Sequence, residues 1–335
     1  MIKTKRKVPV TVIVLAYKRL KYVMDAINSV LSNTVIPDQI IFSKCTENPI
    51  IDAKLKNIGV DVLTFGDNLS YGEVLINSLM KAKFDIVSIL EDDDIFLPGK
   101  IEEIYSNFLS DKSVIFIKDQ KTVFRNNNID FDLRQHSNQF LTLRNTRNSD
   151  FILPIKKFDN IIELFKLEFN VNPSTMSFRK DFLLENRDVV LCSDPLDVVL
   201  GSLAIESRSG KMRILRSSYT GYRVHETNDS IITSRTDAEI RRIKLTWNKY
   251  LNGLLRLSRV LSDNSFCSIY VDLYIYNQYM VLLEFNPQNV RNIIKLGWKI
   301  IMFAYSNSEK KFSVLLYTLK RLFYPVVQRM LIWKA

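Results

Sequence analysis

Runs of apolar residues of strand length alternate with segments of helical apolar spacing over the first hundred residues. The β-branched run Val10–Ala16 predicts a strand buried on both faces, and the residues after Arg19 have helical spacing. The alternation continues with strands predicted over 39–43, 60–65 and 85–90, a turn at Pro37-Asp38 and a helix over 71–82. Strands and helices in alternation require crossover connections. We therefore expect an α/β fold with a Rossmann-like, mostly parallel sheet and helices on both faces.

The pattern changes in the second half of the chain. Pro98 is placed to start a helix, and residues from about 111 to 160 are polar, which predicts a loop-rich region around a site. From residue 234 onward apolar positions have helical spacing, with few glycines. The sequence thus predicts an α/β domain over 1–233 and a basic amphipathic helical extension over 234–335.

Composition indicates a folded protein in a reducing compartment. Of 335 residues, 47% are hydrophobic and 25% are charged, as in globular chains. The three cysteines are scattered and there are two histidines, so neither a disulfide framework nor a multi-histidine zinc site is expected. The basic start runs into a strand pattern rather than a signal sequence, and no apolar stretch reaches spanning length. We expect a cytoplasmic protein.

Positive charge is concentrated in the last third of the chain. The net charge is +11, and residues from Arg235 onward hold 16 Lys and Arg against 6 Asp and Glu. In the segment 289–306 and in a helix predicted over 312–334, these cations share helices with tryptophan and large aliphatic residues. Such helices suit an anionic membrane surface at the inner face of the cell membrane, or packing against protein with a solvated basic rim.

Four consecutive acids, Glu91-Asp92-Asp93-Asp94, follow the strand predicted over 85–90 directly. Two carboxylates about 4 Å apart repel by about 1 kcal/mol in water and by more in a protein. A divalent cation removes this repulsion, and Mg²⁺ or Mn²⁺ uses one or two protein carboxylates together with water and phosphate oxygens. Ligands of open α/β sheets bind at the carboxyl ends of strands. The alternative is an acidic turn that caps the next helix.

Three segments resemble glycosyltransferase family 2, which has the GT-A fold. They lie in the family's order, and they are Val12-Ile13-Val14-Leu15-Ala16-Tyr17-Lys18-Arg19, the acidic segment running on to Leu97-Pro98, and Tyr222-Arg223-Val224-His225. The resemblance implies an inverting, metal-assisted transfer of a sugar from a nucleotide-diphosphate donor to an acceptor hydroxyl. Because the basic extension over 234–335 suits a membrane surface, we expect a lipid-linked or glycan acceptor there.

Residue by residue, the resemblance implies a donor site and a metal site. Asp93 is expected to ligate Mn²⁺ or Mg²⁺ with His225 beside it, although His225 also suits a turn or cap. The remaining residues expected at the nucleotide sugar are Ala16, Tyr17, Arg19, Ser43, Glu73, Glu91, Asp92 and Arg223. Ser43-Lys44-Cys45-Thr46 and Gly72-Glu73 depart from the family's usual residues, so the nucleotide base stays open.

The catalytic base is expected in Cys192–Leu200, which resembles the family's acidic pair before a hydrophobic helix. A carboxylate there takes a proton from the attacking hydroxyl. Asp194 precedes Pro195 and suits a helix N-cap, so we favour Asp197 while both remain candidates. The segment Asn172–Arg179 is either an acceptor contact or a strand and turn.

Two other functions fit parts of the sequence. A glycosyltransferase-like scaffold that binds glycan or nucleotide without turnover shares the donor features but does not need the base. A nucleic-acid-binding protein fits the basic charge, but the cations are interleaved with large aliphatics and no recognition module is visible. We expect no nucleic-acid partner.

Overall fold

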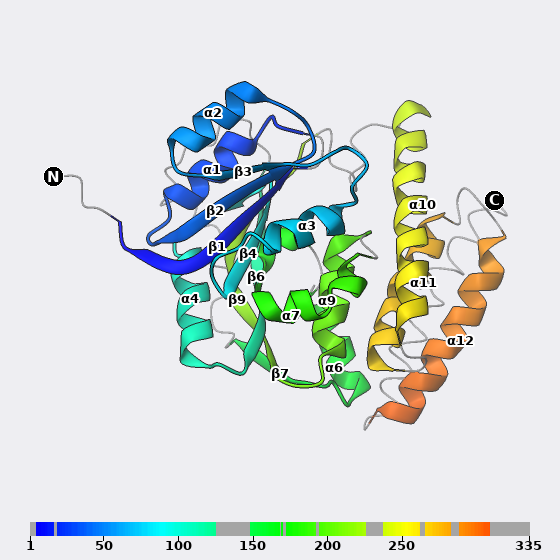
Figure 1. Cartoon of the computed structure of the whole chain (residues 1–335). Helices are drawn as coiled ribbons and strands as arrows, with labels where there is room; N and C mark the ends of the chain where they lie inside the picture. The colour runs from blue at the N-terminus through cyan, green and yellow to red at the C-terminus, as the bar shows by residue number, and fades with distance from the viewer. Residues whose placement is uncertain are drawn as a thin grey trace. The chain divides into compact units, whose positions relative to one another are not determined.

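The structure is a computed structural model that describes residues 5–16, 19–124, 148–167, 169, 172–191, 194–225, 237–261, 265–282 and 288–308. Among these residues nine strands form one sheet, in the order β3-β2-β1-β4-β8-β6-β9-β5, with β7 also paired to β9 (Figure 1). The α/β fold predicted from the alternation is confirmed, as is the GT-A type of fold that the family resemblance implies. The described residues of the predicted C-terminal extension are almost all helical.

The first four strands form a parallel half-sheet. Their bounds are β1 Lys7–Ala16, β2 Ile36–Lys44, β3 Asp61–Thr64 and β4 Ile86–Glu91. The connecting helices are α1 Val23–Leu31, α2 Pro49–Asn57 and α3 Tyr71–Leu79. The chain adds β2 and β3 on one side of β1 and then β4 on the other. The carboxyl ends of β1 and β4 therefore flank a topological switch point, where such sheets bind ligands.

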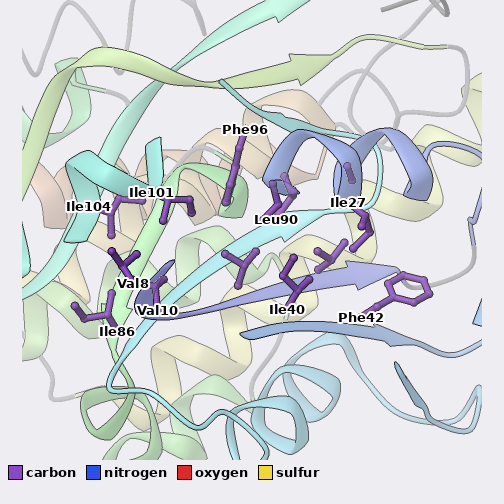
Figure 2. Close-up of a cluster of buried hydrophobic side chains, with 14 of the residues drawn as sticks. Val8, Val10, Ile27, Ile40, Phe42, Ile86, Leu90, Phe96, Ile101 and Ile104 are labelled. Atoms are coloured by element: carbon purple, nitrogen blue, oxygen red, sulfur yellow. The ribbon is translucent and has the colours of Figure 1, made fainter. Parts of the chain in front are cut away.

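Alternate residues of the strands face two layers of helices. Val10, Val12 and Val14 of β1 lie in one apolar layer with residues of α1, α2 and α4 (Lys100–Ser110), as Figure 2 shows in part. On the opposite face, Ser43 of β2 lies against Ser78 of α3, with 2.6 Å between the hydroxyl oxygens. Because both faces are covered, the strands read as continuous apolar runs.

The other half of the sheet mixes directions. It consists of β5 Ile95–Phe96, β6 Val114–Phe124, β7 Ser149–Ile152, β8 Met176–Arg179 and β9 Lys211–Arg223. β6 runs parallel to β9, and the β4–β8, β6–β8, β5–β9 and β7–β9 pairs are antiparallel. β8 follows a single 3₁₀ turn, η2 Pro173–Thr175, and leads to α7 Lys180–Glu185 and α8 Arg187–Val190.

By packing, the chain divides into two compact units. Unit 1 comprises 1–152, 170–200 and 209–228, and unit 2 comprises 153–169, 201–208 and 229–335. Unit 2 contains α6 Phe158–Lys166, α10 Asp237–Val260, α11 Phe266–Leu282 and α12 Asn289–Asn307, and α11 packs against the other three. Helix α9 (Leu196–Glu206) contributes its first residues to unit 1. The division at residue 233 stays a prediction.

Three local expectations differ from the structure. Pro37 and Asp38 lie inside β2 rather than in a turn, because β2 begins at Ile36 beside the amino end of β1. Residues 114–124 form β6 within the region predicted as loops, since the β6–β9 pairing uses polar residues between apolar ones. Helix α4 begins at Lys100, after Pro98 and the left-handed Gly99. The helix predicted over 312–334 lies outside the described residues.

Candidate active site

The acidic segment 91–94 lies at the switch point of the sheet. Glu91 is the last residue of β4 and is paired with Leu15 of β1, and the Asp92 amide donates to the Leu15 carbonyl at 3.0 Å. Asp92, Asp93 and Asp94 are all buried, with at most 5% of their surface exposed. Four acids in such a place require positive charge or protons.

Asp93 contacts two basic side chains, Arg19 and His225. Arg19 places Nη2 at 2.8 Å from Asp93 Oδ2 and at 3.7 Å from Asp92 Oδ1. His225 places Nε2 at 3.0 Å from the same Asp93 oxygen. Although burial alone raises the pKa of Asp93, the His225 hydrogen bond and the Arg19 charge bring that pKa below its ordinary value. Asp93 is therefore the acid of the segment whose ionised form its surroundings favour.

For Glu91 and Asp92 the Arg19 charge does not outweigh the effect of burial. Burial and the neighbouring Asp93 raise the pKa of Asp92 to about 8, and they raise that of Glu91 as well. Glu91 accepts a hydrogen bond from the Tyr71 hydroxyl at 3.3 Å. Asp92 Oδ2 is buried without a hydrogen-bond partner. An orphaned acceptor of this kind needs an external donor or cation.

Asp94 hydrogen-bonds to residues from two other parts of the chain. Its Oδ2 accepts from Asn172 Nδ2 and from Ser174 Oγ, both at 2.7 Å. Its Oδ1 accepts from the Arg223 backbone amide at 3.0 Å. Burial and the charge of Asp93 raise the pKa of Asp94 to about 7. Asp94 thus anchors the acidic segment to Asn172, Ser174 and Arg223.

Arg223 is also held inside the protein. Its Nε donates to the Asp93 carbonyl at 2.8 Å and its Nη2 pairs with Asp25 at 2.9 Å. The guanidinium lies between two rings, 4.2 Å from the centroid of Tyr22 and 4.8 Å from that of Phe124. The predicted contact of Arg223 with the donor stays a prediction. The contacts described here hold the backbone of the acidic segment in place.

The two candidate bases precede and open α9. Asp197 lies in its first turn, where Oδ1 accepts from the Val198 amide at 2.9 Å and Oδ2 accepts from the Asn172 amide at 3.3 Å. The protein around it raises the pKa of Asp197 to about 6, with burial as the main cause. Asp194 is half-buried before the helix. Asp197 is thereby linked through Asn172 to Asp94.

A comparison with protein families identifies the family of this chain. The family model described as Glycosyl transferase family 2 matches residues 11–185, just over half of the chain. The chain belongs to glycosyltransferase family 2. The matched span runs from β1 through the acidic segment to the end of α7. The activity predicted from the motifs, glycosyl transfer, is thus confirmed at the level of the family.

Solved structures agree with this glycosyltransferase fold. The crystal structure of S. aureus TarS 1–349 in complex with UDP-GlcNAc matches with a TM-score of 0.53 at 13% identity, covering 96% of this chain and 88% of that one. A second crystal structure of S. aureus TarS 1–349 matches with a TM-score of 0.50 at 13% identity, covering 96% of this chain and 87% of that one. At this identity the likeness shows the fold. No curated protein sequence matches the chain.

The remaining residues predicted at the donor lie around the same edge of the sheet. Ala16 ends β1 beside Lys44, and it is buried. Ser43 is fully buried against Ser78. The Glu73 carboxylate accepts from the Ser70 amide at 2.7 Å in a capping box that starts α3. Tyr17 lies outside the described residues, and the donor contacts of all four stay predictions.

The polar residues of Asn172–Arg179 that were considered for the acceptor are mostly buried. Ser174, Thr175 and Ser177 are at most 1% exposed, and Ser177 donates to Ser88 of β4 at 2.9 Å. The segment is a turn and a strand, the second of the two interpretations from the sequence.

Sequence reasoning missed Asn172, Tyr71 and Asp25 as parts of this centre. Asn172 has φ +69°, a left-handed value that asparagine adopts more readily than most residues. An asparagine before proline was the signal available for a turn here. Nothing in the local pattern of Tyr71 or Asp25 indicates the partners that the fold brings to them.

A fully buried lysine supports the centre from behind. Lys100 Nζ donates to Asp119 Oδ1 at 2.8 Å, to the Ser174 carbonyl at 2.6 Å and to Thr220 Oγ1 at 2.7 Å. It also lies 4.3 Å from the ring centroid of Phe96. Burial lowers the pKa of Lys100, and Asp119 opposes that shift. The ion pair fixes the turn at Ser174, which in turn holds Asp94.

Lys100→Met is expected to destabilise the protein by about 3–5 kcal/mol, because it leaves Asp119 charged and buried without its cation. Urea unfolding of the two proteins measures this directly. The exposed Lys83 is a matched control, and Lys83→Met is expected to change stability by less than about 0.5 kcal/mol. Equal stabilities for the two variants would contradict the supporting role of Lys100.

Proposed function

We propose that this glycosyltransferase moves a sugar, with inversion, from a nucleotide-diphosphate donor to an acceptor hydroxyl, assisted by Mn²⁺ or Mg²⁺. The observation that carries the proposal is the convergence of Asp92, Asp93 and Arg19 at the carboxyl ends of β1 and β4. The S. aureus TarS structure of similar fold is described as a complex with UDP-GlcNAc, which supports a nucleotide sugar as the donor.

The residues present fit a divalent cation held jointly with the donor. Asp93 Oδ2 and His225 Nε2 are 3.0 Å apart, the spacing of two adjacent ligands on an octahedral ion with bonds of about 2.1 Å. The unpartnered Asp92 Oδ2 is a further acceptor beside them. Within the described residues no group of three or more ligand side chains is arranged as a complete site. Mg²⁺ characteristically takes its other ligands from water and phosphate.

The chain's own groups account for binding and proton transfer. Arg19 would pair with the diphosphate if a bound cation neutralised Asp93, and Asp92 would hydrogen-bond to a hydroxyl of the donor. Asp197, whose pKa is raised to about 6, takes the proton of the acceptor hydroxyl as that oxygen attacks the anomeric carbon. The sugar–phosphate bond breaks on the opposite side, so the configuration inverts. A bound divalent cation would stabilise the charge of the departing diphosphate.

Thermal-shift screening of nucleoside diphosphates, with and without Mn²⁺, tests the proposed donor. Binding at one hundred times Kd stabilises the folded state by about 2.7 kcal/mol. We expect one nucleoside diphosphate to give a shift that requires the metal. UDP is the first nucleotide to test, because the TarS structure of similar fold is a complex with UDP-GlcNAc. No shift from any nucleotide at millimolar concentration would argue against the proposal.

We further propose that unit 2 docks on an anionic membrane, which suits a lipid-linked or glycan acceptor at that surface. Helix α12 packs through one face and exposes Ile294, Trp298, Met302 and Tyr305, each between 43% and 59% exposed. These residues are three or four positions apart and so form one stripe. The exposed Arg291 and Lys295 lie beside them. Tryptophan, aliphatic residues and cations on one helix suit a bilayer interface.

In the described residues no helix has the length and apolar composition to cross a bilayer. The proposed attachment is therefore peripheral, on the cytoplasmic face of the membrane where anionic lipids lie. The helix predicted over 312–334 belongs to the same proposal.

Replacing Trp298 and Met302 with serine is expected to lower binding to vesicles of anionic lipid by at least about tenfold, since each buried apolar side chain contributes about 1.5–3 kcal/mol. Vesicle flotation measures the bound fraction. Leu245→Ser on α10 is the matched control, because Leu245 is 72% exposed and is not on α12. Unchanged flotation of the double variant would remove α12 as the docking face. Loss of self-association instead would identify a second copy as its partner.

A further inference from the structure

Asn172 contacts the two halves of the proposed active centre at once. Its side-chain Nδ2 donates to Asp94 Oδ2 at 2.7 Å, on the acidic segment. Its backbone amide donates to Asp197 Oδ2 at 3.3 Å, at the start of α9. The acidic segment and Asp197 are about a hundred residues apart in the sequence. One residue therefore spans the proposed donor side and the proposed base.

The conformation of Asn172 makes these two contacts possible. Its φ of +69° and ψ of 109° turn the chain so that the side chain and the backbone amide reach different partners. Both ends of the side chain are engaged: Oδ1 accepts from the Ser174 amide at 2.7 Å while Nδ2 donates to Asp94. The Asn172 carbonyl accepts from Thr175 Oγ1 at 2.7 Å. Only 6% of the residue is exposed.

Asp197 depends on this amide for one of its two oxygens. Its Oδ1 is held by the amide of the following residue, Val198, at 2.9 Å. That contact restrains only one of the two carboxylate oxygens. The bond from the Asn172 amide to Oδ2 fixes the carboxylate plane. A base must point at the hydroxyl proton within hydrogen-bond reach, so this orientation matters for the reaction.

We infer that Asn172 is a positioning residue: its bond to Asp94 fixes the backbone amide that orients Asp197 toward the acceptor hydroxyl. The inference rests on the proposed function, which makes Asp197 the base. It links the orientation of the base to the acidic segment that holds the donor. A displacement of about 1 Å in such a centre lowers a rate by up to about 10²-fold.

Asn172→Gly tests the side chain while leaving the backbone free to keep its positive φ. We expect kcat for transfer to fall by about ten- to a hundredfold, with the Kd for the nucleoside diphosphate in Mn²⁺ changed less than about threefold. Ser177→Ala is the control, because it also removes a buried hydrogen bond of the adjoining strand, and it is expected to keep its kcat. A wild-type kcat in Asn172→Gly would overturn the inference.

Combination with Asp197→Asn separates positioning from a merely structural role. If Asn172 acts through Asp197, the Asn172→Gly change has little further effect once the base is gone. An equal loss in both backgrounds would show that Asn172 acts independently, and it would overturn the inference. If Asp197→Asn retains the wild-type kcat, the assignment of Asp197 as the base is wrong. That result is distinct from an unchanged kcat in Asn172→Gly, which contradicts only the role of Asn172.

A crystal structure of Asn172→Gly decides the matter where the doubly substituted enzyme is too slow to assay. The inference expects the Asp197 carboxylate to rotate and to lose the contact between Oδ2 and the amide of residue 172. If that contact persists near 3.3 Å, the side chain of Asn172 does not set the orientation of the base.

Discussion

Asp197→Asn is expected to lower kcat by about 10²- to 10⁴-fold, the contribution usual for a positioned general base. Affinity for the nucleoside diphosphate should change little, because Asp197 lies at the start of α9 and its hydrogen-bonded link to the acidic segment runs through Asn172. Steady-state kinetics together with nucleotide binding measure the two quantities. Asp194→Asn is the matched comparison, and it is expected to keep most of the rate.

The same base gives the reaction a defined pH dependence. Asp197 must be ionised to accept a proton, and its pKa is raised to about 6. The rate kcat/KM should therefore fall as the pH drops below about 6, and this acid limb should be absent in Asp197→Asn. A full rate in Asp197→Asn, combined with a loss in Asp194→Asn, would transfer the role of base to Asp194.

The stability of this variant separates chemistry from folding. The folded protein holds Asp197 at a pKa above its unfolded value, so the folded state binds the proton more tightly. This carboxyl thus favours folding least at high pH, once the pH exceeds about 6. Asparagine removes the buried charge and is not expected to lower Tm at pH 8. A loss of rate with an unchanged Tm would exclude unfolding as its cause.

Asp93→Asn is expected to abolish the metal-dependent part of donor binding. Asp93 is the acid that the surrounding charges keep ionised, and an amide does not replace a carboxylate as a ligand of Mn²⁺ or Mg²⁺ at equal strength. The stabilisation by nucleoside diphosphate that requires Mn²⁺, about 2.7 kcal/mol at one hundred times Kd, should disappear. Differential scanning fluorimetry with and without EDTA measures it.

A remote acid provides the control for this prediction. Asp38 is exposed in the amino-terminal part of β2, and Asp38→Asn is expected to keep the full metal-dependent shift. Retention of that shift in Asp93→Asn would contradict the assignment of Asp93, and it would point to Asp92 or Glu91 as the metal ligand.

The parallel half of the sheet was readable from the sequence because both of its faces are covered. β1 and β4 are largely apolar, and the acids begin at the last residue of β4 without an intervening loop. The position of the acidic segment follows from those two facts and from the rule for switch points. The mixed half was less legible, since β6 alternates polar and apolar residues and β8 is only four residues long.

Within the site, the sequence identified the acidic residues but could not assign a separate role to each of them. Asp92, Asp93 and Asp94 are adjacent and chemically identical, yet one lacks a partner for Oδ2, one pairs with Arg19, and one accepts three hydrogen bonds. These differences arise from Arg19, Asn172, Ser174 and Arg223, which are distant in the sequence and which only the fold brings near. Asn172 is the clearest example of a residue whose partners, Asp94 and Asp197, are known only from the fold.

A crystal structure with Mn²⁺ and the nucleoside diphosphate that gives the largest thermal shift would test most directly whether these acids are the donor site. We predict one cation with Asp93 among its ligands, at about 2.1 Å, bridging to the diphosphate beside Arg19. A nucleotide bound elsewhere, with Asp93 still paired only with Arg19 and His225, would contradict it.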